Sequence, residues 1–347
     1  MKRLVAVMIC AVMLCGFITS APAESKYSRN IFGYFDTVTT IMAYVNTQEE
    51  FDRICVLAEN EMDDLHKLFD GYNSYSGLHN LWYLNQYAAK EPVQVEEPLF
   101  DLLLQCRDMQ AEYSKVNIAM GSVLVLWHNA RETGVLPQPE ALQAAALHTD
   151  FSDVILDEEN RTVFFADPEL KLDLGAVAKG YAADRIQSLV TPHCPSFLIS
   201  LGGNIYAGDP PLDGRKKWGV SIQCPDGVMP MQFGTDRVEV LYVRNLSVVT
   251  SGDYQRYMTV DGVRYHHLID PATHMPATHL RAVTVVCESG FQADFFSTLL
   301  FLLPYEEGMA LVQDTPGVEA LFILADGSIH LSPGLEEMAL SHGASAR

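Results

Sequence analysis

Cysteine is scarce in this sequence, and no two cysteines have the CxxC spacing of a zinc ligand pair or a redox motif. Two of the seven cysteines lie before residue 24, and the other five are far apart: Cys55, Cys106, Cys194, Cys224 and Cys287. This odd number and wide spacing exclude both a zinc site and a disulfide-stapled scaffold. We expect most of these residues to be small, buried and apolar in character.

Basic residues are also few. Lys and Arg total 23 against 44 Asp and Glu, which gives a formal net charge of −21. A nucleic-acid-binding surface needs clustered basic residues, so this composition argues against nucleic acid as a partner. An acidic protein that binds an anionic ligand must offset its own electrostatic field with a metal ion or with backbone N–H groups.

Long apolar runs are absent, because none reaches the ~20 residues that a membrane-spanning helix needs. The longest, residues 4–18, follows two basic residues and precedes the small-residue pattern Ala21-x-Ala23. This is the organisation of a signal peptide and its cleavage site, so we expect residues 1–23 to be a signal peptide. Export to the periplasm or the cell envelope follows. Cys15 offers the alternative of a lipid anchor, which would make the protein membrane-associated.

The mature chain, residues 24–347, has the length of one large domain or of two intimately joined subdomains. A capping box at Thr47-x-x-Glu50 predicts the start of a long amphipathic helix. Further helices are expected at residues 97–114 and 139–147. Strand-like composition and alternation predict β-strands at 34–44, 197–200, 218–224, 238–243 and 280–287, with a hairpin at 154–165.

A glycine-containing turn precedes a predicted helix in residues 172–189, LDLGAVAKGYAADRIQSL. A glycine turn at a helix N-terminus presents free N–H groups and the positive end of the helix dipole, which suit a phosphate, while a nearby Asp suits a ribose hydroxyl. Asp173 and Lys179 are the candidate ligand-binding residues. The sequence has neither GxGxxG nor GxxxxGK[ST], so close helix packing is the alternative explanation for the small residues.

Residues 250–276 hold two predicted strands, a hairpin signal at Asp261-Gly262, and several groups suited to acid–base chemistry. His267 and Asp253 are the candidate general bases, His267 because the usual pKa of histidine lies near neutrality. An ordinary hairpin with a surface histidine pair is the alternative.

Three oxygen-bearing side chains fall on one face of the predicted helix that contains ADFFSTLLFLL: Asp294, Ser297 and Thr298. Oxygen ligands of this kind suit Mg²⁺ or Ca²⁺ and not zinc. The alternative is that Asp294 favours the helix N-terminus while the two hydroxyls bond to the preceding turn.

Two further segments have features of a ligand site. Residues 68–87 combine Gly, Asn and Ser with aromatic residues that would line a flat aromatic ligand or fill the space under a loop, and Tyr72 is the candidate among them. Gly121, near the start of the apolar run 118–127, marks a place where another backbone passes closely.

Five motifs in this order resemble the ApbE family of FAD:protein FMN transferases: LDLGAVAKGYAAD, SLGGNIYAG, VVTSGDYQRY, RYHHLIDPATHMP and ADFFSTLLFLL. The resemblance extends from about residue 35 to residue 322. It implies an α+β fold related to the T-fold, with antiparallel sheets, flanking helices and FAD in a central cleft. The mature chain would then be a single domain of this type.

The resemblance also implies roles for individual residues. Mg²⁺ would be held by the backbone carbonyl of Ala176 and by the side chains of Asp294, Ser297 and Thr298. His267 and Asp253 are the candidates for catalysis. FAD would be bound by Phe35, Tyr72, Ala119, Met120, Gly121, Asp173, Lys179, His267 and Ile269.

The implied reaction is Mg²⁺-dependent transfer of FMN from FAD to a Thr or Ser hydroxyl of an acceptor flavoprotein, with release of AMP. The acceptor would be exported or membrane-bound and carry a Ser/Thr FMN-attachment motif. Two alternatives remain at this point. The same site would hydrolyse FAD to FMN and AMP if water replaced the hydroxyl, or the protein would be a flavin-binding component of the envelope without enzymatic activity.

Overall fold

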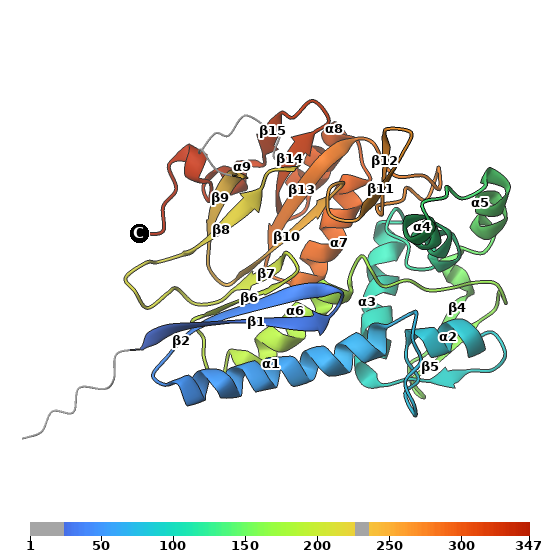
Figure 1. The fold of residues 1–347 in the computed structure, drawn as a ribbon, viewed down its shortest axis with the longest axis horizontal. Coiled ribbons are helices and arrows are strands. Elements are labelled where there is room, and N and C mark those ends of the chain that lie inside the picture. The colour runs from blue at the N-terminus through green and yellow to red at the C-terminus, as the bar shows by residue number, and fades with distance from the viewer. Residues whose placement is uncertain (1–23, 226–235) are drawn as a thin grey trace, which may run out of the picture.

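An eight-stranded antiparallel sheet forms the centre of the computed structural model, which describes residues 24–225 and 236–347 (Figure 1). The strand order is β1-β2-β6-β7-β10-β13-β14-β15. The strands are β1 (Ser25–Tyr34), β2 (Thr37–Val45), β6 (Phe197–Leu201), β7 (Asn204–Ala207), β10 (Leu246–Gly252), β13 (Leu280–Cys287), β14 (Glu319–Leu324) and β15 (Ile329–Leu331). The expected α+β class with antiparallel sheets is confirmed.

The described residues also form three smaller antiparallel sheets. They are β3-β5-β4 (Val93–Gln94, Thr162–Phe165, Val154–Asp157), β8-β9 (Trp218–Gln223, Arg237–Val243) and β11-β12 (Tyr257–Val260, Val263–His266). The last two strands are joined at Asp261 and Gly262, which have φ angles of 51° and 79°. Two positive φ angles are what a tight hairpin turn requires, so the hairpin predicted there is confirmed.

The helices begin where the sequence signals place them. Thr47 accepts a hydrogen bond from the Glu50 backbone N–H over 3.2 Å, as the capping box predicts. Proline occupies the first turn of α3 and of α5. The α-helices are α1 (Gln48–Phe69), α2 (Leu81–Tyr87), α3 (Glu97–Glu112), α4 (Gly121–Thr133), α5 (Pro139–Ala146), α6 (Ala178–Val190), α7 (Gly290–Phe301), α8 (Tyr305–Asp314) and α9 (Pro333–Glu336).

The two faces of the large sheet are buried by different elements. Helices α1, α6 and α7 pack on one face and form the main apolar core with alternate strand residues such as Ile41 and Val283. The intervening residues, such as Leu198 and Val286, face β8-β9 and α9 and form a second core. Alternation with a period of two therefore divides the strand residues between two cores, which fixes the register of the sheet.

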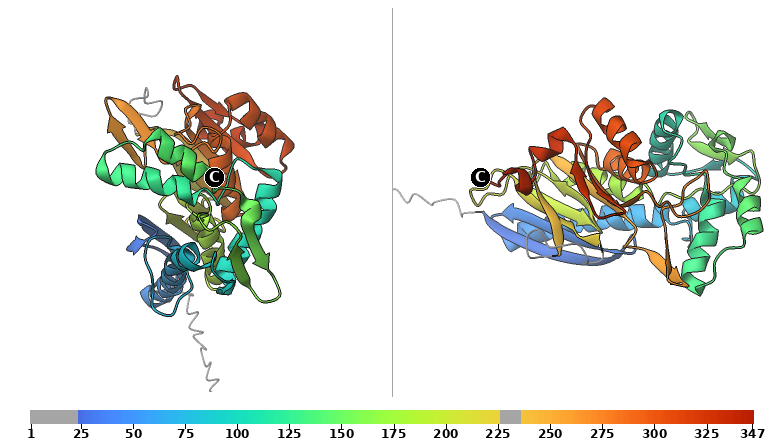
Figure 2. Two further views of the ribbon diagram at one scale, coloured as in Figure 1. Left: turned by 90° about the vertical axis from the view of Figure 1, so that its right-hand side faces the viewer. Right: turned by 90° about the horizontal axis from the view of Figure 1, so that it is seen from above.

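A third apolar cluster joins α4 and α5 to the β11-β12 hairpin, and we call these elements the lobe. Trp127 of α4 stacks on Tyr265 of β12 with ring centroids 5.9 Å apart, and its Nε1 donates to the backbone oxygen of His274 over 2.8 Å. The lobe lies at the upper right in Figure 1, and Figure 2, seen from above, places α4 and α5 at the end of the molecule away from β1.

Two local predictions need adjustment. The strand expected from residue 34 begins at Thr37, because Phe35 and Asp36 have φ angles of 51° and form the turn between β1 and β2. The apolar run at 118–127 contains the start of α4. A backbone does pass closely at Gly121, where a Cβ atom would lie 2.6 Å from the carbonyl oxygen of Lys171.

All five cysteines of the described chain are buried and unpaired, as expected. The predicted signal peptide and Cys15 lie outside the described residues. Among the residues described, no helix has the length and apolar character needed to span a bilayer.

Candidate active site

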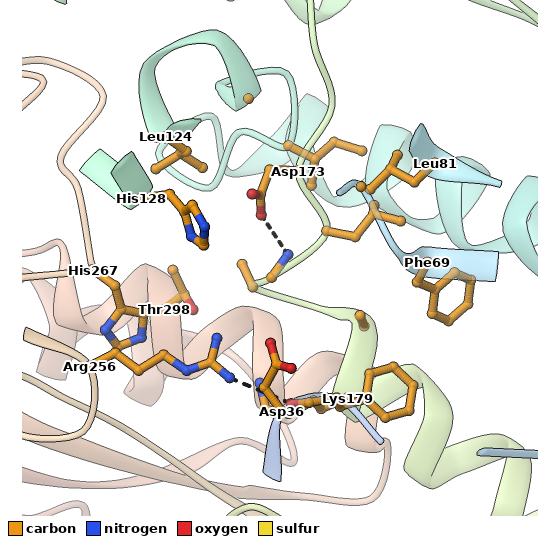
Figure 3. Close-up of a pocket in the computed structure, with 18 of the residues that line it drawn as sticks. Asp36, Phe69, Leu81, Leu124, His128, Asp173, Lys179, Arg256, His267 and Thr298 are labelled. Carbon is orange, nitrogen blue, oxygen red and sulfur yellow. Dashed lines mark hydrogen bonds between the residues drawn. The ribbon is translucent and has the colours of Figure 1, made fainter. Parts of the chain in front are cut away.

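A cleft of about 1120 Å³ opens between the lobe and the α6–α7 side of the main body. Its walls come from distant parts of the sequence: the β1–β2 turn, the loop after α1, α4, the turn before α6, α7, and the segments that flank β11-β12. Figure 3 shows Asp173, Lys179, His267 and Thr298 around this space.

Most of the predicted site residues line the cleft. They are Phe35, Tyr72, Met120, Gly121, Asp173, Ala176, Lys179, His267, Ile269, Asp294 and Thr298. The fold thus brings together residues that are more than 250 positions apart in the sequence, from the β1–β2 turn to α7.

Three predicted residues do not line the cleft, and each has a physical reason. Ala119 is fully buried in the main core. Ser297 is also fully buried, with its hydroxyl 2.9 Å from that of Ser251 and donating to the backbone oxygen of Asp294. Asp253 accepts a hydrogen bond from Arg281 over 2.7 Å and pairs with Arg264 at 3.4 Å. Its carboxylate is therefore engaged in ion pairs away from the cleft.

The inner wall is a close crossing of α6 and α7. A Cβ atom on Gly180 would lie 2.2 Å from the carbonyl oxygen of Gly290 and 2.6 Å from the Asp294 Cβ, so only glycine permits this approach. The Gly180 N–H donates to Asp294 Oδ2 over 2.8 Å. Asp294 therefore supplies a cap to the first turn of α6, where the N-cap residue Val177 makes no side-chain cap bond.

A second carboxylate holds the start of α7. Asp184 of α6 accepts hydrogen bonds from the backbone N–H groups of Gly290 and Phe291 over 2.6 and 3.0 Å, and from the Ser289 hydroxyl over 2.8 Å. Each helix thus contributes an acid that caps the other. This reciprocal capping fixes where α7 presents Asp294 and Thr298 to the cleft.

Asp294 is nearly fully buried, with 4% of its surface exposed. Burial raises the pKa of its carboxyl, and the charge of Lys179 acts in the opposite direction. The Lys179 Nζ lies 4.0 Å from Asp294 Oδ2. A buried carboxylate with a single distant cation is well suited to an additional positive charge nearby.

Asp294 and Thr298 lie one turn apart on α7 and line the cleft together with Ala176, so the groups that they offer are a carboxylate, a hydroxyl and a backbone carbonyl. Within residues 24–225 and 236–347, no three His, Cys, Asp or Glu side chains gather closely enough to hold a metal ion alone. One carboxylate with neutral oxygens fits Mg²⁺, which keeps waters and binds substrate phosphates, better than a metal that needs a complete protein cage.

His267 also lines the cleft, and its Nδ1 is buried without a hydrogen-bond partner among the described residues. Burial, followed by the charge of Arg256, lowers the pKa of His267 to about 3. The imidazole is therefore neutral at physiological pH. A neutral ring with a free nitrogen can accept a proton.

An aromatic pair marks another part of the cleft. Tyr72 stacks on His128 of α4 with ring centroids 4.5 Å apart and an interplanar angle of 29°. Both rings line the cleft, and the Tyr72 side chain is half exposed. Stacked planar groups of this kind provide a surface for a flat aromatic ligand.

Sequence reasoning missed Arg131, Arg256 and His128, all of which line the cleft. Helical spacing would have found two of them, because Leu124, His128 and Arg131 recur at intervals of four and three along α4 and face the cleft together. Arg256 lies within the VVTSGDYQRY stretch, but nothing in its local sequence indicates where its side chain points.

The ordered motifs and this geometry agree with a comparison to protein families, in which the model of the ApbE family matches residues 35–322. The chain belongs to the ApbE family. A FAD:protein FMN transferase from Treponema pallidum is 39% identical over 73% of this chain and 72% of its own length. One from Klebsiella pneumoniae is 34% identical over 72% of this chain and 76% of its own length.

Solved structures of ApbE proteins have the same fold. The ApbE protein from Thermotoga maritima superposes with a TM-score of 0.80 at 27% identity, covering 90% of this chain and 99% of its own. The flavin transferase ApbE from Vibrio cholerae gives a TM-score of 0.77 at 22% identity, over 90% of this chain and all of its own. The expected ApbE-like architecture is thus confirmed.

Proposed function

We propose that this protein transfers FMN from FAD to a Thr or Ser hydroxyl of an acceptor flavoprotein. The observation that carries the proposal is the cleft itself. In an ApbE-family chain, it joins a buried carboxylate and a hydroxyl on α7, a lysine on α6, and a neutral histidine that follows β12. FAD is the substrate named for the curated relatives.

In the proposed reaction, the acceptor hydroxyl oxygen attacks the phosphorus on the FMN side of the FAD diphosphate. A new P–O bond to the acceptor forms, the bridging P–O bond breaks, and AMP leaves with the electron pair of that bond. The hydroxyl proton passes to a base. FMN then remains attached to the acceptor through a phosphoester.

His267 is the proposed base, since its neutral ring faces the cleft whereas Asp253 is held by arginines outside it. Neighbouring cations contribute to its low pKa, and the negative charge of a bound diphosphate would offset them. Substrate binding therefore moves the pKa of His267 upward, toward the range that suits a general base.

Asp294, Thr298 and the Ala176 carbonyl would hold Mg²⁺, which when bound would neutralise charge on the diphosphate and help to align it. Ser297 would support this set from behind by bonding the Asp294 backbone. Lys179 is placed to contact phosphate oxygens. Tyr72 would lie against the flavin ring, and Phe35, Met120, Gly121, Asp173 and Ile269 would line the remainder of the FAD site.

We further propose that the protein works outside the cytoplasm, in the periplasm or the cell envelope, on exported or membrane-bound flavoproteins. The support is the signal-peptide pattern of residues 1–23. Lipidation at Cys15 would attach it to the membrane.

The experiment incubates the mature protein with FAD and Mg²⁺, with and without a purified acceptor domain, and follows AMP release together with the intact mass of the acceptor. A mass gain of one FMN residue with matching AMP is the expected result. AMP with free FMN and unmodified acceptor would show a pyrophosphatase, and bound FAD without AMP would show a flavin-binding protein.

A further inference from the structure

Two arginines of the lobe region line the cleft without a carboxylate partner. Arg131 lies on α4, and Arg256 immediately precedes β11. Among the described residues, Arg131 makes no hydrogen bond or ion pair, and the single hydrogen bond of Arg256 runs to the Phe35 backbone oxygen at 3.5 Å, the outer limit for such a bond. Figure 3 shows the Arg256 side chain extending from beside His267 toward Asp36.

Several arginines outside the cleft are paired with acids. Arg107 pairs with Glu158 at 2.8 Å, Arg185 with Glu61 at 2.9 Å, Arg215 with Asp213 at 2.8 Å and Arg281 with Asp253 at 2.7 Å. With a net charge of −21, the protein has many more acids than it needs for such pairs. Arg53, Arg161 and Arg244 also have no ion pair among the described residues, but they lie outside the cleft, whereas Arg131 and Arg256 both line it.

The lack of an ion pair is unfavourable for Arg131, because its side chain is partly buried and its charge is less well hydrated. Burial lowers the pKa of its guanidinium, and the nearby charge of Arg256 acts in the same direction, while Tyr72 and Asp173 act in the opposite direction. Two like charges that face one cavity destabilise each other and favour an anionic ligand.

Three of the cleft acids accept hydrogen bonds from backbone N–H groups. Asp70 accepts from the backbone N–H groups of Tyr72 and Asn73, Asp173 accepts from Gly175, and Asp294 accepts from Gly180. The basic residues that line the same cleft are Lys115, Arg131, Lys171, Lys179 and Arg256. These five basic residues face four acids, Asp36, Asp70, Asp173 and Asp294, so the cleft is far less acidic than the protein as a whole.

We propose that Arg131 and Arg256 bind the phosphate groups of FAD from the lobe side, independently of any metal. This rests on the proposed function for the identity of the ligand. The planar guanidinium group donates two parallel hydrogen bonds, which match phosphate oxygens, and a neutral flavin ring would not need them. Lys179 and Asp294 face the diphosphate from the main body, and the two arginines face it from the other side.

This arrangement gives the arginines a part in the reaction as well as in binding. Negative charge on the phosphate oxygens redistributes as the bridging bond breaks, and fixed cations in a partly enclosed site stabilise that charge. The pair also compensates locally for the acidity of the whole protein, which would otherwise repel a dinucleotide.

The test measures binding of FAD, FMN and riboflavin in EDTA to the wild-type protein, Arg131→Gln, Arg256→Gln and the double variant. Each substitution should weaken FAD binding about 10- to 100-fold, because it removes a charged hydrogen bond, and should leave riboflavin binding unchanged. Arg244→Gln, at an exposed arginine outside the cleft, is the matched control and should have no effect.

Equal losses for FAD and riboflavin would overturn the proposal, since they would show a general change of the cleft. It would also be overturned if the Gln variants kept wild-type affinity for FAD, or if the wild-type protein did not bind FAD without metal. Arg131→Lys and Arg256→Lys, which keep the charge, should restore part of the lost affinity. Because these measurements need no acceptor, they stand even if FMN transfer is not observed.

Discussion

The two walls of the cleft are built in different ways. The α6–α7 wall belongs to the main core, relies on glycines at its closest approach, and has a carboxylate from each helix capping the other. The lobe wall has a smaller apolar cluster of its own and is fastened by the Trp127 contacts. The comparison indicates that the wall proposed to hold the metal is fixed by close packing, whereas the wall with the arginines and His267 is more weakly secured.

Replacing Asp294 should have the largest effect on the fixed wall. We expect Asp294→Asn to lower FMN transfer by about a thousandfold or more at any Mg²⁺ concentration, because several kcal/mol of metal-dependent stabilisation would be lost. Thermal stability should change little, since the amide oxygen can still accept from Gly180 and a buried charge is removed. AMP release against Mg²⁺ concentration measures this, with exposed Asp326→Asn as the control. Substantial turnover at saturating Mg²⁺ would exclude Asp294 as a metal ligand.

Forcing the two helices apart should have the next largest effect. In Gly180→Ala, the new methyl group would overlap the Gly290 carbonyl, so we expect a loss of about 1–3 kcal/mol in the free energy of unfolding. Transfer activity should also fall, because the Gly180 bond to Asp294 would be displaced.

Chemical denaturation and AMP release test this prediction. The matched control is Gly219→Ala on β8, where a Cβ atom would meet its nearest neighbour at an ordinary 3.4 Å. If both variants were equally stable, the close crossing would not contribute to the rigidity of this wall.

Loosening the lobe should have a smaller and more local effect. Trp127→Phe removes the hydrogen bond to His274, which is worth about 1 kcal/mol. We expect faster hydrogen exchange in α4 and a raised KM for FAD, with little change in global stability. Trp218→Phe loses an equivalent 2.8 Å bond to Asp209 in the second core and should leave the KM for FAD unchanged. The same KM change in both variants would contradict a separate lobe.

The pH response should be the smallest effect near neutrality. Folding lowers the pKa of His267 from 6.5 to about 3, so between these values the unfolded chain binds more protons than the folded one. The contribution of His267 is complete above pH 6.5 and decreases as the pH falls, by less than about 1.4 kcal/mol for each pH unit. Denaturation of wild type and His267→Gln between pH 7 and 5 measures it. Parallel stability curves would show that His267 is not buried in its neutral form.

Local signals in the sequence predicted much of the fold. The capping box gave the start of α1, and the Asp261-Gly262 pair gave the β11-β12 hairpin, since both depend on residues that are neighbours in the chain. On α7, helical spacing placed Asp294 and Thr298 together correctly. It did not show that Ser297 turns instead toward Ser251 of β10, because that contact depends on how the helix packs.

The remaining site residues depend on long-range pairing. Asp253 was a reasonable candidate base from its sequence context, but Arg281, 28 positions later on the neighbouring strand β13, occupies its carboxylate. Arg131 was missed because the apolar run before it ends at Trp127, although α4 continues to Thr133. The arrangement of charges around the cleft is thus a property of the assembled fold.

The position of the turn formed by Phe35 and Asp36 also fixes the distance between the cleft and the first residue of β1. It lies at the cleft, while Ser25 lies at the other end of the ten-residue strand β1, about 33 Å away at the usual rise per residue. If lipidation at Cys15 tethers the chain and β1 points away from the membrane, this strand holds the cleft away from the start of the described chain by a length comparable to the hydrocarbon thickness of a bilayer. An acceptor in the same membrane would then need its modified hydroxyl on a segment that projects well beyond the headgroups.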